Sequence, residues 1–548
     1  MKLRQSLAAF REVFRNVGLR RLQLAFAGSI IGTWAYSIAI VVYAYDQGGA
    51  TAVGIVTAAR FTLAAAASPF ASILGDRYDR RWVMVASDAT RALFLALTGV
   101  AAVANAPSWI VYVLSGLVAI AVTPFRPAEA ALTPSLAKTP EQLTAANVVA
   151  STIESVGIFA GPALGGILLA AAGVGTVFLV STGLLLWSAA LIVGIHPPER
   201  EPAPEADSIT DELLAGVRVI AKERRLRLLV GLFSAQTFVD GMLGVLVVVV
   251  ALDLLGTGKA GVGFLNSAVG IGGLLGAVAT AALMGRKRLA ADFGLGIFMW
   301  GVPIALVAVW PNQAFALVLL GLVGVGNTIV DVSGMTLLQR SAPEEVLARV
   351  FGVLESMFMI TIALGSLAAP LLLSTLGTRG ALVAAGALLP VLLIPSWSTL
   401  AKLDDGGSVP AEQLELLRAV PIFAPLPEAT IERLAAELQE VQAAAGSTIF
   451  EQGAAGDLFY VVRSGEVEVQ ADGKPPIVLD RGGFFGEIAL LRGTPRTASV
   501  RARSEAGLYS LSRDIFIPAV TGYAPSHDAA NRVVNLRLAP PRAGLVRV

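Results

Sequence analysis

The sequence predicts an all-α polytopic membrane domain of twelve transmembrane helices in two six-helix halves, followed by a small cytoplasmic β-roll with flanking helices. The 548 residues are 55% hydrophobic and only 15% charged, whereas charged residues make up about a quarter of a soluble protein. The apolar excess is confined to residues 22–400, and residues 401–548 have an ordinary soluble composition. A wholly soluble protein is therefore excluded.

Twelve apolar segments reach the roughly 20 residues that a helix needs to cross a bilayer. They cover residues 22–45, 51–74, 83–104, 108–129, 144–172, 175–195, 226–254, 260–284, 290–310, 313–338, 347–376 and 380–400. The longest loop, 196–225, separates a first half, 22–195, from a second half, 226–400. Two related halves of this kind are typical of transporters.

Basic residues gather in alternate loops, and this bias predicts the orientation of the spans. They occur in the basic, amphipathic N-terminus, 1–21, and in the loops after the second and eighth spans. The loop residues are Arg77, Arg80, Arg81, Arg286, Lys287 and Arg288. We therefore expect a multi-pass protein of the cell (inner) membrane with both termini and the central loop in the cytoplasm.

A charged loop, Gly75-Asp76-Arg77-Tyr78-Asp79-Arg80-Arg81, follows the second span. Asp88 and Arg91 come soon after it, at the start of the third span. Because acidic and basic residues alternate, the loop can exchange salt-bridge partners when two helix bundles move, and we interpret it as a gating loop. The alternative is that its charges only anchor the spans at the membrane surface.

Small residues recur along the fifth span, which contains Gly157, Gly161, Pro162, Gly165 and Gly166. Glycines one helical turn apart let helix backbones approach closely. Pro162 removes one hydrogen bond of the helix and can kink it. Plain helix packing and a conformational switch explain this pattern equally well.

These two motifs resemble those of the major facilitator superfamily, and the resemblance covers residues 15–400. The charged loop is similar to the family's G-x-x-x-D-R-x-x-R-R loop in a shortened form. The fifth span is similar to the G-x-x-x-G-P-x-x-G-G pattern of proton-coupled exporters. The resemblance implies alternating access and substrate:proton antiport, with no enzymatic step. The second half departs from it, because Gly285-Arg286-Lys287-Arg288 lacks the acidic residue.

Charged residues inside spans are functional candidates, because each costs about 2.5–3.5 kcal/mol to insert. Asp240 and Asp331 lie deep in the seventh and tenth spans, and we expect them to handle coupling protons or a substrate cation. Glu154, in the fifth span, is a third candidate, although it could instead brace the kinked helix. The Ala-, Gly-, Val- and Leu-rich spans hint at a small amphiphilic substrate.

The remainder of the chain begins with a linker, 401–412. Two helices are expected within 412–438, and short segments that favour strands follow between Ser447 and Leu511, separated by glycine turns. Such a pattern favours a small barrel or roll. We assign 413–535 to this domain and 536–548 to a tail.

This region resembles the cyclic nucleotide-binding domain of protein kinase A regulatory subunits and bacterial catabolite activators. The resemblance rests on the run Phe450 to Gly465 and on the run Phe484 to Ala498. The second run supplies the candidate site residues Gly486, Glu487, Ile488, Ala489, Arg496 and Thr497. The resemblance implies that Glu487 accepts the ribose 2′-hydroxyl, and Arg496 has the fixed fork that pairs with a phosphate.

The resemblance favours cAMP as a regulatory ligand, with cGMP as the alternative because Thr497 follows Arg496. The family's base-capping residue comes from the helix after Ser512, and Tyr523 is a guess for it. A surface salt bridge between Glu487 and Arg496 in a domain that binds no ligand and only docks a partner remains an alternative. So does a membrane sensor that detects a solute without transporting it.

The net charge and the counts of cysteine and histidine limit the classes of binding partner that we expect. The formal net charge is +1, so no basic field suggests a nucleic acid. The chain contains no cysteine and two histidines, which excludes disulfides and suggests no metal or cofactor site. We expect the lipid bilayer, a small-molecule substrate and a cyclic nucleotide as partners.

Overall fold

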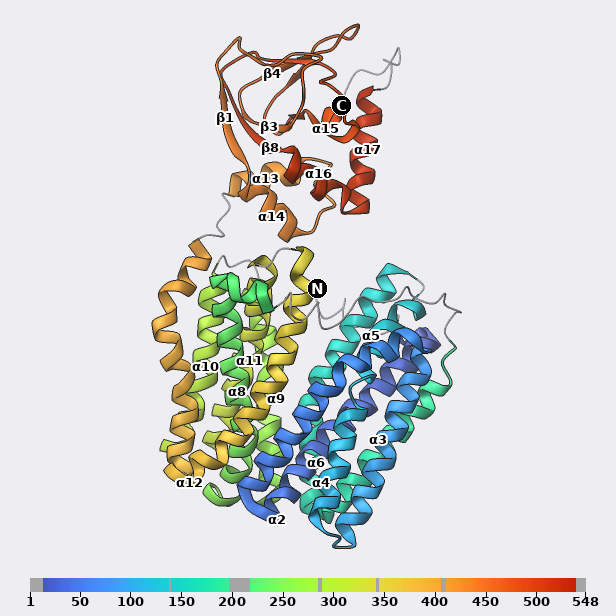
Figure 1. Cartoon of the computed structure of the whole chain (residues 1–548), viewed down its shortest axis with the longest axis vertical. Coiled ribbons are helices and arrows are strands. Elements are labelled where there is room, and N and C mark those ends of the chain that lie inside the picture. The colour runs from blue at the N-terminus through green and yellow to red at the C-terminus, as the bar shows by residue number, and fades with distance from the viewer. Residues whose placement is uncertain are drawn as a thin grey trace. The chain divides into compact units, whose positions relative to one another are not determined.

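The computed structural model describes residues 13–137, 139–196, 217–283, 288–341, 344–405 and 411–538. These residues form two compact units, and the chain passes from the first to the second between residues 404 and 405. The first unit is a bundle of long helices, and the second combines short strands with short helices (Figure 1).

The first unit consists of apolar helices. They are α2 (Val17–Arg77), α3 (Arg80–Val103), α4 (Ser108–Ala121), α5 (Phe125–Leu136), α6 (Pro140–Val193), α8 (Arg224–Val249) with its π-helical continuation η1 (Val250–Leu254), α9 (Gly258–Leu283), α10 (Leu289–Val309), α11 (Gln313–Ser341) and α12 (Glu344–Asp405). In the described part of the chain, nine helical stretches are long and apolar enough to cross a membrane.

Three of these nine stretches are 52 to 55 residues long, which is more than twice the length of one crossing. Each is interrupted by a glycine with a positive φ angle: Gly49 at 61°, Gly173 at 79° and Gly377 at 67°. Glycine adopts this left-handed backbone without the steric cost that a side chain adds. Each long stretch is therefore two crossings, which makes twelve crossings and confirms the predicted fold class.

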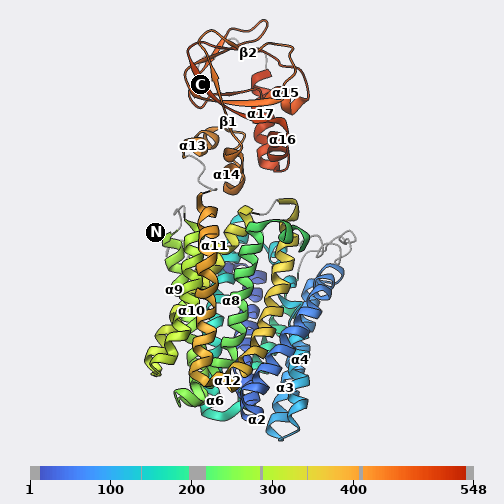
Figure 2. The same cartoon turned by 60° about the vertical axis from the view of Figure 1, so that its left-hand side comes forward.

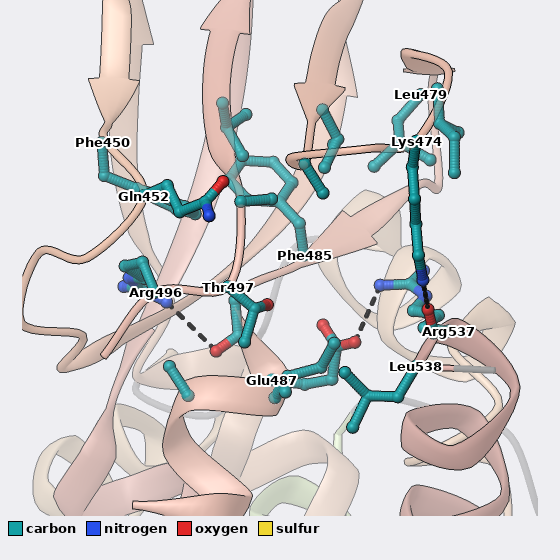
Figure 3. Close-up of a pocket in the computed structure, with 18 of the residues that line it drawn as sticks. Phe450, Gln452, Lys474, Leu479, Phe485, Glu487, Arg496, Thr497, Arg537 and Leu538 are labelled. Carbon is teal, nitrogen blue, oxygen red and sulfur yellow. Dashed lines mark hydrogen bonds and ion pairs between the residues drawn. The ribbon is translucent and has the colours of Figure 1, made fainter. Parts of the chain in front are cut away.

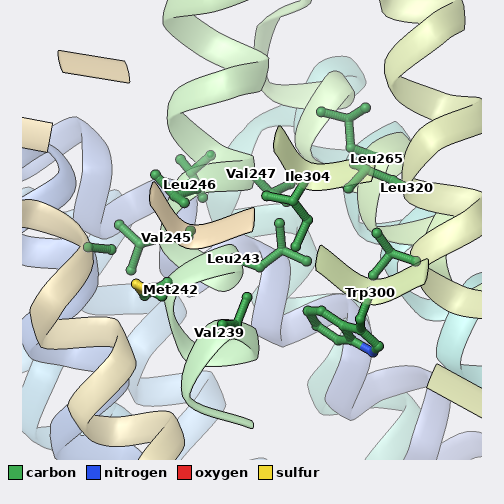
Figure 4. Close-up of a cluster of buried hydrophobic side chains, with 14 of the residues drawn as sticks. Val239, Met242, Leu243, Val245, Leu246, Val247, Leu265, Trp300, Ile304 and Leu320 are labelled. Atoms are coloured by element: carbon green, nitrogen blue, oxygen red, sulfur yellow. The ribbon is translucent and has the colours of Figure 1, made fainter. Parts of the chain in front are cut away.

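The crossings form two halves, α2 to α6 and α8 to α12, which lie side by side in Figure 1 and overlap in the turned view of Figure 2. Helix α8 lies inside the second half and is buried along most of its length. Its side chains Val239, Leu243 and Leu246 pack among residues of α9, α10 and α11, including Leu265 and Trp300 (Figure 4). This interior explains why most side chains of α8 are apolar.

The second unit begins with α13 (Ala411–Ala419) and α14 (Glu428–Ala436). Its strands are β1 (Gln439–Ala443), β2 (Thr448–Phe450), β3 (Leu458–Ser464), β4 (Val467–Gln470), β5 (Ile477–Leu479), β6 (Phe484–Phe485), β7 (Ser499–Ala502) and β8 (Ala506–Ser512). The short helix α15 (Glu487–Arg492) lies between β6 and β7, and α16 (Arg513–Thr521) and α17 (Ala524–Leu538) follow β8.

The strands form two antiparallel four-stranded sheets, in the orders β1-β8-β3-β6 and β2-β7-β4-β5. Val461 of β3 pairs with Tyr509 of β8 in the first sheet, and Val469 of β4 pairs with Val500 of β7 in the second. Phe423, Phe459 and Phe516 pack together where the helices cover the first sheet. This is the predicted roll with flanking helices.

Two predicted boundaries differ from the elements that the structure shows. Helix α12 continues to Asp405, so the first part of the predicted linker, 401–412, is helical. Helix α17 continues to Leu538, into the predicted tail, 536–548. Of the predicted central loop, 196–225, residues 197–216 lie outside the described residues, and residues 217–222 are helical.

Candidate functional site

A pocket of about 410 Å³ lies in the second unit, between strands of the roll, α15 and the end of α17 (Figure 3). All six predicted residues line it: Gly486, Glu487, Ile488, Ala489, Arg496 and Thr497. Most of the remaining wall is apolar, with Phe450, Val469, Ile477, Leu479 and Leu538 among its side chains. The pocket therefore combines a broad apolar surface with a few polar groups, as ligand sites usually do.

Gly486 allows α15 to start at the floor of this pocket. Its φ angle is 92°, and a Cβ atom there would lie 2.8 Å from the carbonyl oxygen of Leu458. Only glycine fits both the left-handed backbone and the close approach to β3. The turn places Glu487 as the first residue of α15, with its side chain directed into the pocket (Figure 3).

Glu487 is a buried carboxylate, and one of its two oxygens has no hydrogen-bond partner among the described residues. Its side chain is 1% exposed, and Oε1 accepts a hydrogen bond from Nη1 of Arg537 at 2.9 Å. Oε2 is buried and has no hydrogen-bond partner among the described residues. Burial raises the pKa of Glu487, and the Arg537 guanidinium opposes that shift. An unsatisfied buried carboxylate oxygen costs free energy unless a ligand donates to it.

Arg496 lies on the other side of Glu487 in the close-up (Figure 3). It is 5% exposed, and its Nη1 and Nη2 donate to the carbonyl oxygens of Gly486, at 3.1 Å, and Leu458, at 2.8 Å. Its guanidinium carbon lies 4.1 Å from the centre of the Phe450 ring, and its Nε is buried without a hydrogen-bond partner in the described part of the chain. Burial lowers the pKa of Arg496.

The alternative of a surface salt bridge between Glu487 and Arg496 does not match this geometry. Both side chains are buried, and the ion pair that the structure gives Glu487 is with Arg537. Sequence reasoning missed Arg537, which falls in the predicted tail. Its Nη1 also donates to the carbonyl oxygen of Phe484 at 3.0 Å, and its guanidinium carbon lies 4.2 Å from the centre of the Phe484 ring.

The residues that line the pocket from the C-terminal helices differ from the expected base-capping residue, Tyr523. Tyr523 is not among the residues that line it, whereas Arg537 and Leu538 of α17 are. Nζ of Lys474, in the turn between β4 and β5, donates to the carbonyl oxygen of Arg537 at 3.0 Å. The end of α17 is therefore held over the pocket by both Glu487 and Lys474.

In the membrane unit, the predicted gating loop joins helix ends of the first half. Gly75, Asp76 and Arg77 end α2, and their side chains lie outside the described ones. Asp79 caps α3 by accepting from the backbone N–H of Arg81 at 2.9 Å. Nη1 of Arg80 donates to the carbonyl oxygen of Ala131, and Nη2 of Arg81 donates to that of Val193.

Among the described side chains, Asp88 and Arg91 do not pair with those of this loop. They form an ion pair with each other at 2.8 Å, and both are at most 1% exposed. Ser29 and Ser188 also donate to Asp88, and Arg91 also donates to Ser29 and Thr33. The pair therefore connects α2, α3 and α6 inside the first half.

The glycines of the fifth crossing lie at two helix contacts. A Cβ atom on Gly157 would lie 2.6 Å from Ile30, on Gly161 2.4 Å from Trp34, and on Gly165 2.9 Å from the carbonyl oxygen of Ala35. These three glycines therefore face α2. Gly166 instead faces α9 of the other half, where a Cβ atom on Gly263 would lie 2.5 Å from the carbonyl oxygen of Pro162.

The coupling candidates have different surroundings. Glu154 forms an ion pair with Arg126, which also pairs with Glu129 at 3.0 Å. Asp331 accepts from Nδ2 of Asn327 at 2.9 Å and interacts electrostatically with Asp240 and Glu355. In the part of the chain that the structure describes, no group of three or more His, Cys, Asp or Glu side chains is arranged to hold a metal ion.

A polar network that sequence reasoning did not single out supports Asp331. Oδ1 of Asn327 accepts hydrogen bonds from Nε2 of Gln236 and from Nε1 of Trp300, both at 3.0 Å. The donors come from α8 and α10, and Asp240 lies one helical turn beyond Gln236 on α8. Uncharged polar residues inside apolar spans were the available signal for this network.

Side-chain contacts between the two halves extend from one end of the bundle, where the first and second crossings meet at Gly49, into its interior, where Oγ of Ser267 donates to the carbonyl oxygen of Phe159 at 2.9 Å. Lys259 pairs with Asp46 at 2.5 Å, and Tyr45 donates to Asp253. Deeper in the bundle, Oγ of Ser366 donates to the carbonyl oxygen of Gly54 at 3.2 Å. Toward the end where α5 lies, the ribbons of the two halves diverge (Figure 1).

Comparison with protein families assigns both units. The model of the Major Facilitator Superfamily matches residues 22–353, and that of the cyclic nucleotide-binding domain matches residues 440–521. Among solved structures, a POT family transporter in complex with a thioalcohol-conjugated peptide is similar over 70% of this chain and 96% of its own. Its TM-score is 0.58 at 14% sequence identity, a likeness of fold.

Two similar curated proteins are cAMP-dependent protein kinase regulatory subunits. The one from Aspergillus fumigatus is 42% identical and the one from Schizosaccharomyces pombe is 38% identical, each over 102 residues. The match covers 18% of this chain and 25% of each relative. The chain thus spans about a quarter of the length of these relatives.

Proposed function

Because this chain belongs to the Major Facilitator Superfamily and carries a cyclic nucleotide-binding domain, we propose that it is a secondary active transporter whose activity cAMP regulates. The observation that carries the regulatory half is the pair of unsatisfied buried atoms in the pocket, Glu487 Oε2 and Arg496 Nε. One accepts and the other donates, which suits a ligand with a sugar hydroxyl and a phosphate.

The pocket geometry favours a mononucleotide that binds with its base on the apolar wall. Glu487 accepts the ribose hydroxyl through Oε2 while Oε1 stays with Arg537. Arg496 turns its fork from the carbonyl oxygens to the cyclic phosphate, and so exchanges two neutral acceptors for an anionic one. Similarity to regulatory subunits named as cAMP-dependent favours cAMP over cGMP.

Calorimetric titration of residues 405–548 with cAMP and with cGMP tests this proposal. We expect micromolar or tighter binding of cAMP, and its loss in Glu487→Ala and in Arg496→Ala. Arg532→Gln is a matched control, because Arg532 is exposed on α17 and does not line the pocket. If the folded domain binds neither nucleotide, the regulatory proposal is wrong and a role in docking a partner is favoured.

For the membrane unit, we propose alternating access around a site between the two halves. Contacts between the halves at one end, with the other end diverging, are what such a cycle requires of one of its two states. The basic residues Arg80, Arg81 and Arg288 favour the diverging end as cytoplasmic, with both termini on that side of the inner membrane. The glycines of the fifth span support proton-coupled efflux of a small amphiphilic solute.

Asp240 and Asp331 are our candidates for the coupling protons. They interact with each other, and Asp331 is held by Asn327 rather than by a basic residue. Glu154 is the weaker candidate, because its ion pair with Arg126 gives it a bracing role. In proteoliposomes, we expect Asp240→Asn or Asp331→Asn to abolish uptake driven by a pH gradient. Unchanged transport in both variants would exclude them.

A continuous path inside the second unit supports regulation through α17. Arg537 at one end of α17 contacts the pocket, and Oγ of Ser526 at its other end donates to the carbonyl oxygen of Ile422 at 2.6 Å. That segment follows α13, which comes directly after the linker. Coupling of 1–3 kcal/mol is typical for such two-site systems, and it would change the affinity of one site by about 5- to 150-fold when the other is occupied.

Transport measurements separate this proposal from a solute sensor. Counterflow of a labelled solute in proteoliposomes, with and without cAMP at proven occupancy, reports net transport and its regulation together. Identical rates in both conditions would remove the regulatory role and leave the transporter. Absence of counterflow for every solute tested in a protein that binds cAMP would favour the sensor.

A further inference from the structure

A second cavity, with a volume of about 650 Å³, is a groove in the first half of the membrane unit. It lies between the second crossing of α2, the first part of α3 and the end of α4, and its walls include Phe70, Val83, Phe94, Leu117 and Ile120. Two of the hydroxyls that line it are already used. Ser87 donates to the carbonyl oxygen of Ala121, and Thr123 donates to that of Ile120.

The groove opens on the surface that crosses the membrane. Phe70, Leu117 and Ile120 are exposed, although they lie in apolar crossings. All lining residues belong to the first half. An exposed apolar groove in a crossing segment is in contact with acyl chains in a bilayer.

One end of the groove carries aromatic residues and a positive charge. Tyr78 and Trp82, which are 63% and 52% exposed, line the groove where α3 begins. Aromatic residues at this position are typical of the membrane–water interface. The guanidinium carbon of Arg81 lies 4.8 Å from the centre of the Trp82 ring. The apolar groove thus ends beside a cation.

The guanidinium of Arg81 is only partly satisfied. Nη2 donates to the carbonyl oxygen of Val193 at 2.5 Å. Nε is buried and out of reach of a ligand, whereas Nη1 is not among the buried atoms and has no hydrogen-bond partner in the described part of the chain. Arg81 therefore retains hydrogen-bond donors for an anion at the membrane surface.

We propose that this groove binds an anionic phospholipid, with one acyl chain along the apolar walls and the phosphate at Arg81. The occupant has to be apolar over the length of the groove and negatively charged at its end. A lipid of that kind satisfies both requirements at once, and basic pockets between transmembrane helices are known to select anionic headgroups. The site is separate from the nucleotide pocket and from the interface between the halves.

Fluorescence quenching by brominated lipids tests the proposal on the full chain in nanodiscs. Trp82 is the reporter, and its share of the emission is the difference between the wild-type protein and Trp82→Phe. We expect brominated phosphatidylglycerol to quench this share with saturation, at about fivefold lower mole fraction than brominated phosphatidylcholine. Arg81→Gln should abolish the preference, whereas Arg288→Gln, a control at an exposed arginine, should retain it.

A second pair of variants tests the groove itself. Ala86→Phe fills it, because Ala86 lines the groove, and should remove the saturable quenching. Ala89→Phe is the matched control, since Ala89 is exposed on the same helix and does not line the groove. Equal, non-saturating quenching by both lipids would mean that Trp82 contacts annular lipid only, and the proposal would be wrong. Displacement of the anionic lipid by inorganic phosphate would also overturn it.

Discussion

The buried carboxylate of Glu487 on α15 is paired with Arg537 of α17, with 2.9 Å between Oε1 and Nη1. These residues are 50 positions apart in the chain. The contact connects the residue that is expected to read the ribose with the last helix of the domain. Whatever changes the charge or the partner of Glu487 therefore acts on α17 as well.

Replacement of Arg537 by glutamine should destabilise the second unit. It would leave Glu487 buried without a charged partner, and removing one member of a buried pair is costly. Because the Arg537 side chain is 33% exposed and thus partly screened, we expect about 1–2 kcal/mol in the free energy of unfolding. Urea denaturation of residues 405–548 measures it. Arg532→Gln on the same helix should change it by less than about 0.5 kcal/mol.

The raised pKa of Glu487 predicts a pH dependence of stability. A carboxyl whose pKa is higher in the folded state stabilises the fold only while it is protonated. This contribution is complete below its ordinary value of 4.5 and is lost as the pH rises through the raised pKa. Compared with Glu487→Gln, the wild-type domain should therefore lose up to about 1.4 kcal/mol of stability per pH unit between pH 4.5 and the raised pKa, and no more above it. Parallel unfolding curves for both proteins at all pH values would contradict this.

The ion pair between Asp46 and Lys259 should favour the state in which this end of the bundle is closed. The side chains are 38% and 46% exposed, and exposed pairs contribute about 0.2–1 kcal/mol. Lys259→Gln should therefore shift the equilibrium toward opening at this end by up to about fivefold. The charge-swapped double variant, Asp46→Lys with Lys259→Asp, should restore it.

Spin labels at Gln47→Cys and Leu255→Cys would measure this shift as a distance distribution. The chain contains no native cysteine, so the two introduced thiols are the only labelling sites. An unchanged distribution in Lys259→Gln would show that the pair does not bias the equilibrium.

Close backbone contact between the halves predicts a strong effect of Gly263→Ala. The added Cβ atom would meet the carbonyl oxygen of Pro162 at 2.5 Å and Cα of Gly166 at 2.6 Å, and neither is the end of a flexible side chain. Overpacking of this kind costs about 1–3 kcal/mol, so we expect a lower Tm and slower transport. Gly183→Ala is the control, because nothing lies within 4 Å of its added Cβ atom. Similar behaviour of both variants would refute the steric argument.

The sequence predicted those features that depend on local pattern. Apolar length alone located the twelve crossings, and the nucleotide-site motif lies within one stretch, so all six of its candidate residues line one pocket. Arg537 was not predicted, because its role depends on a contact across 50 positions that no local pattern records. Gln236, Trp300 and Asn327 were missed for the same reason, since three different helices bring them together.

The buried pair of Asp88 and Arg91 has a consequence for how the molecule can move. Its hydrogen bonds to Ser29, Thr33 and Ser188 hold three helices together. Because both charged groups are buried, water cannot replace these hydrogen bonds if they break. Shearing one of these helices past another would strand a charge in the membrane interior. The first half should therefore move as a rigid body. Distances between residues within it should stay constant during transport, so they can serve as the reference for measuring how far the second half moves.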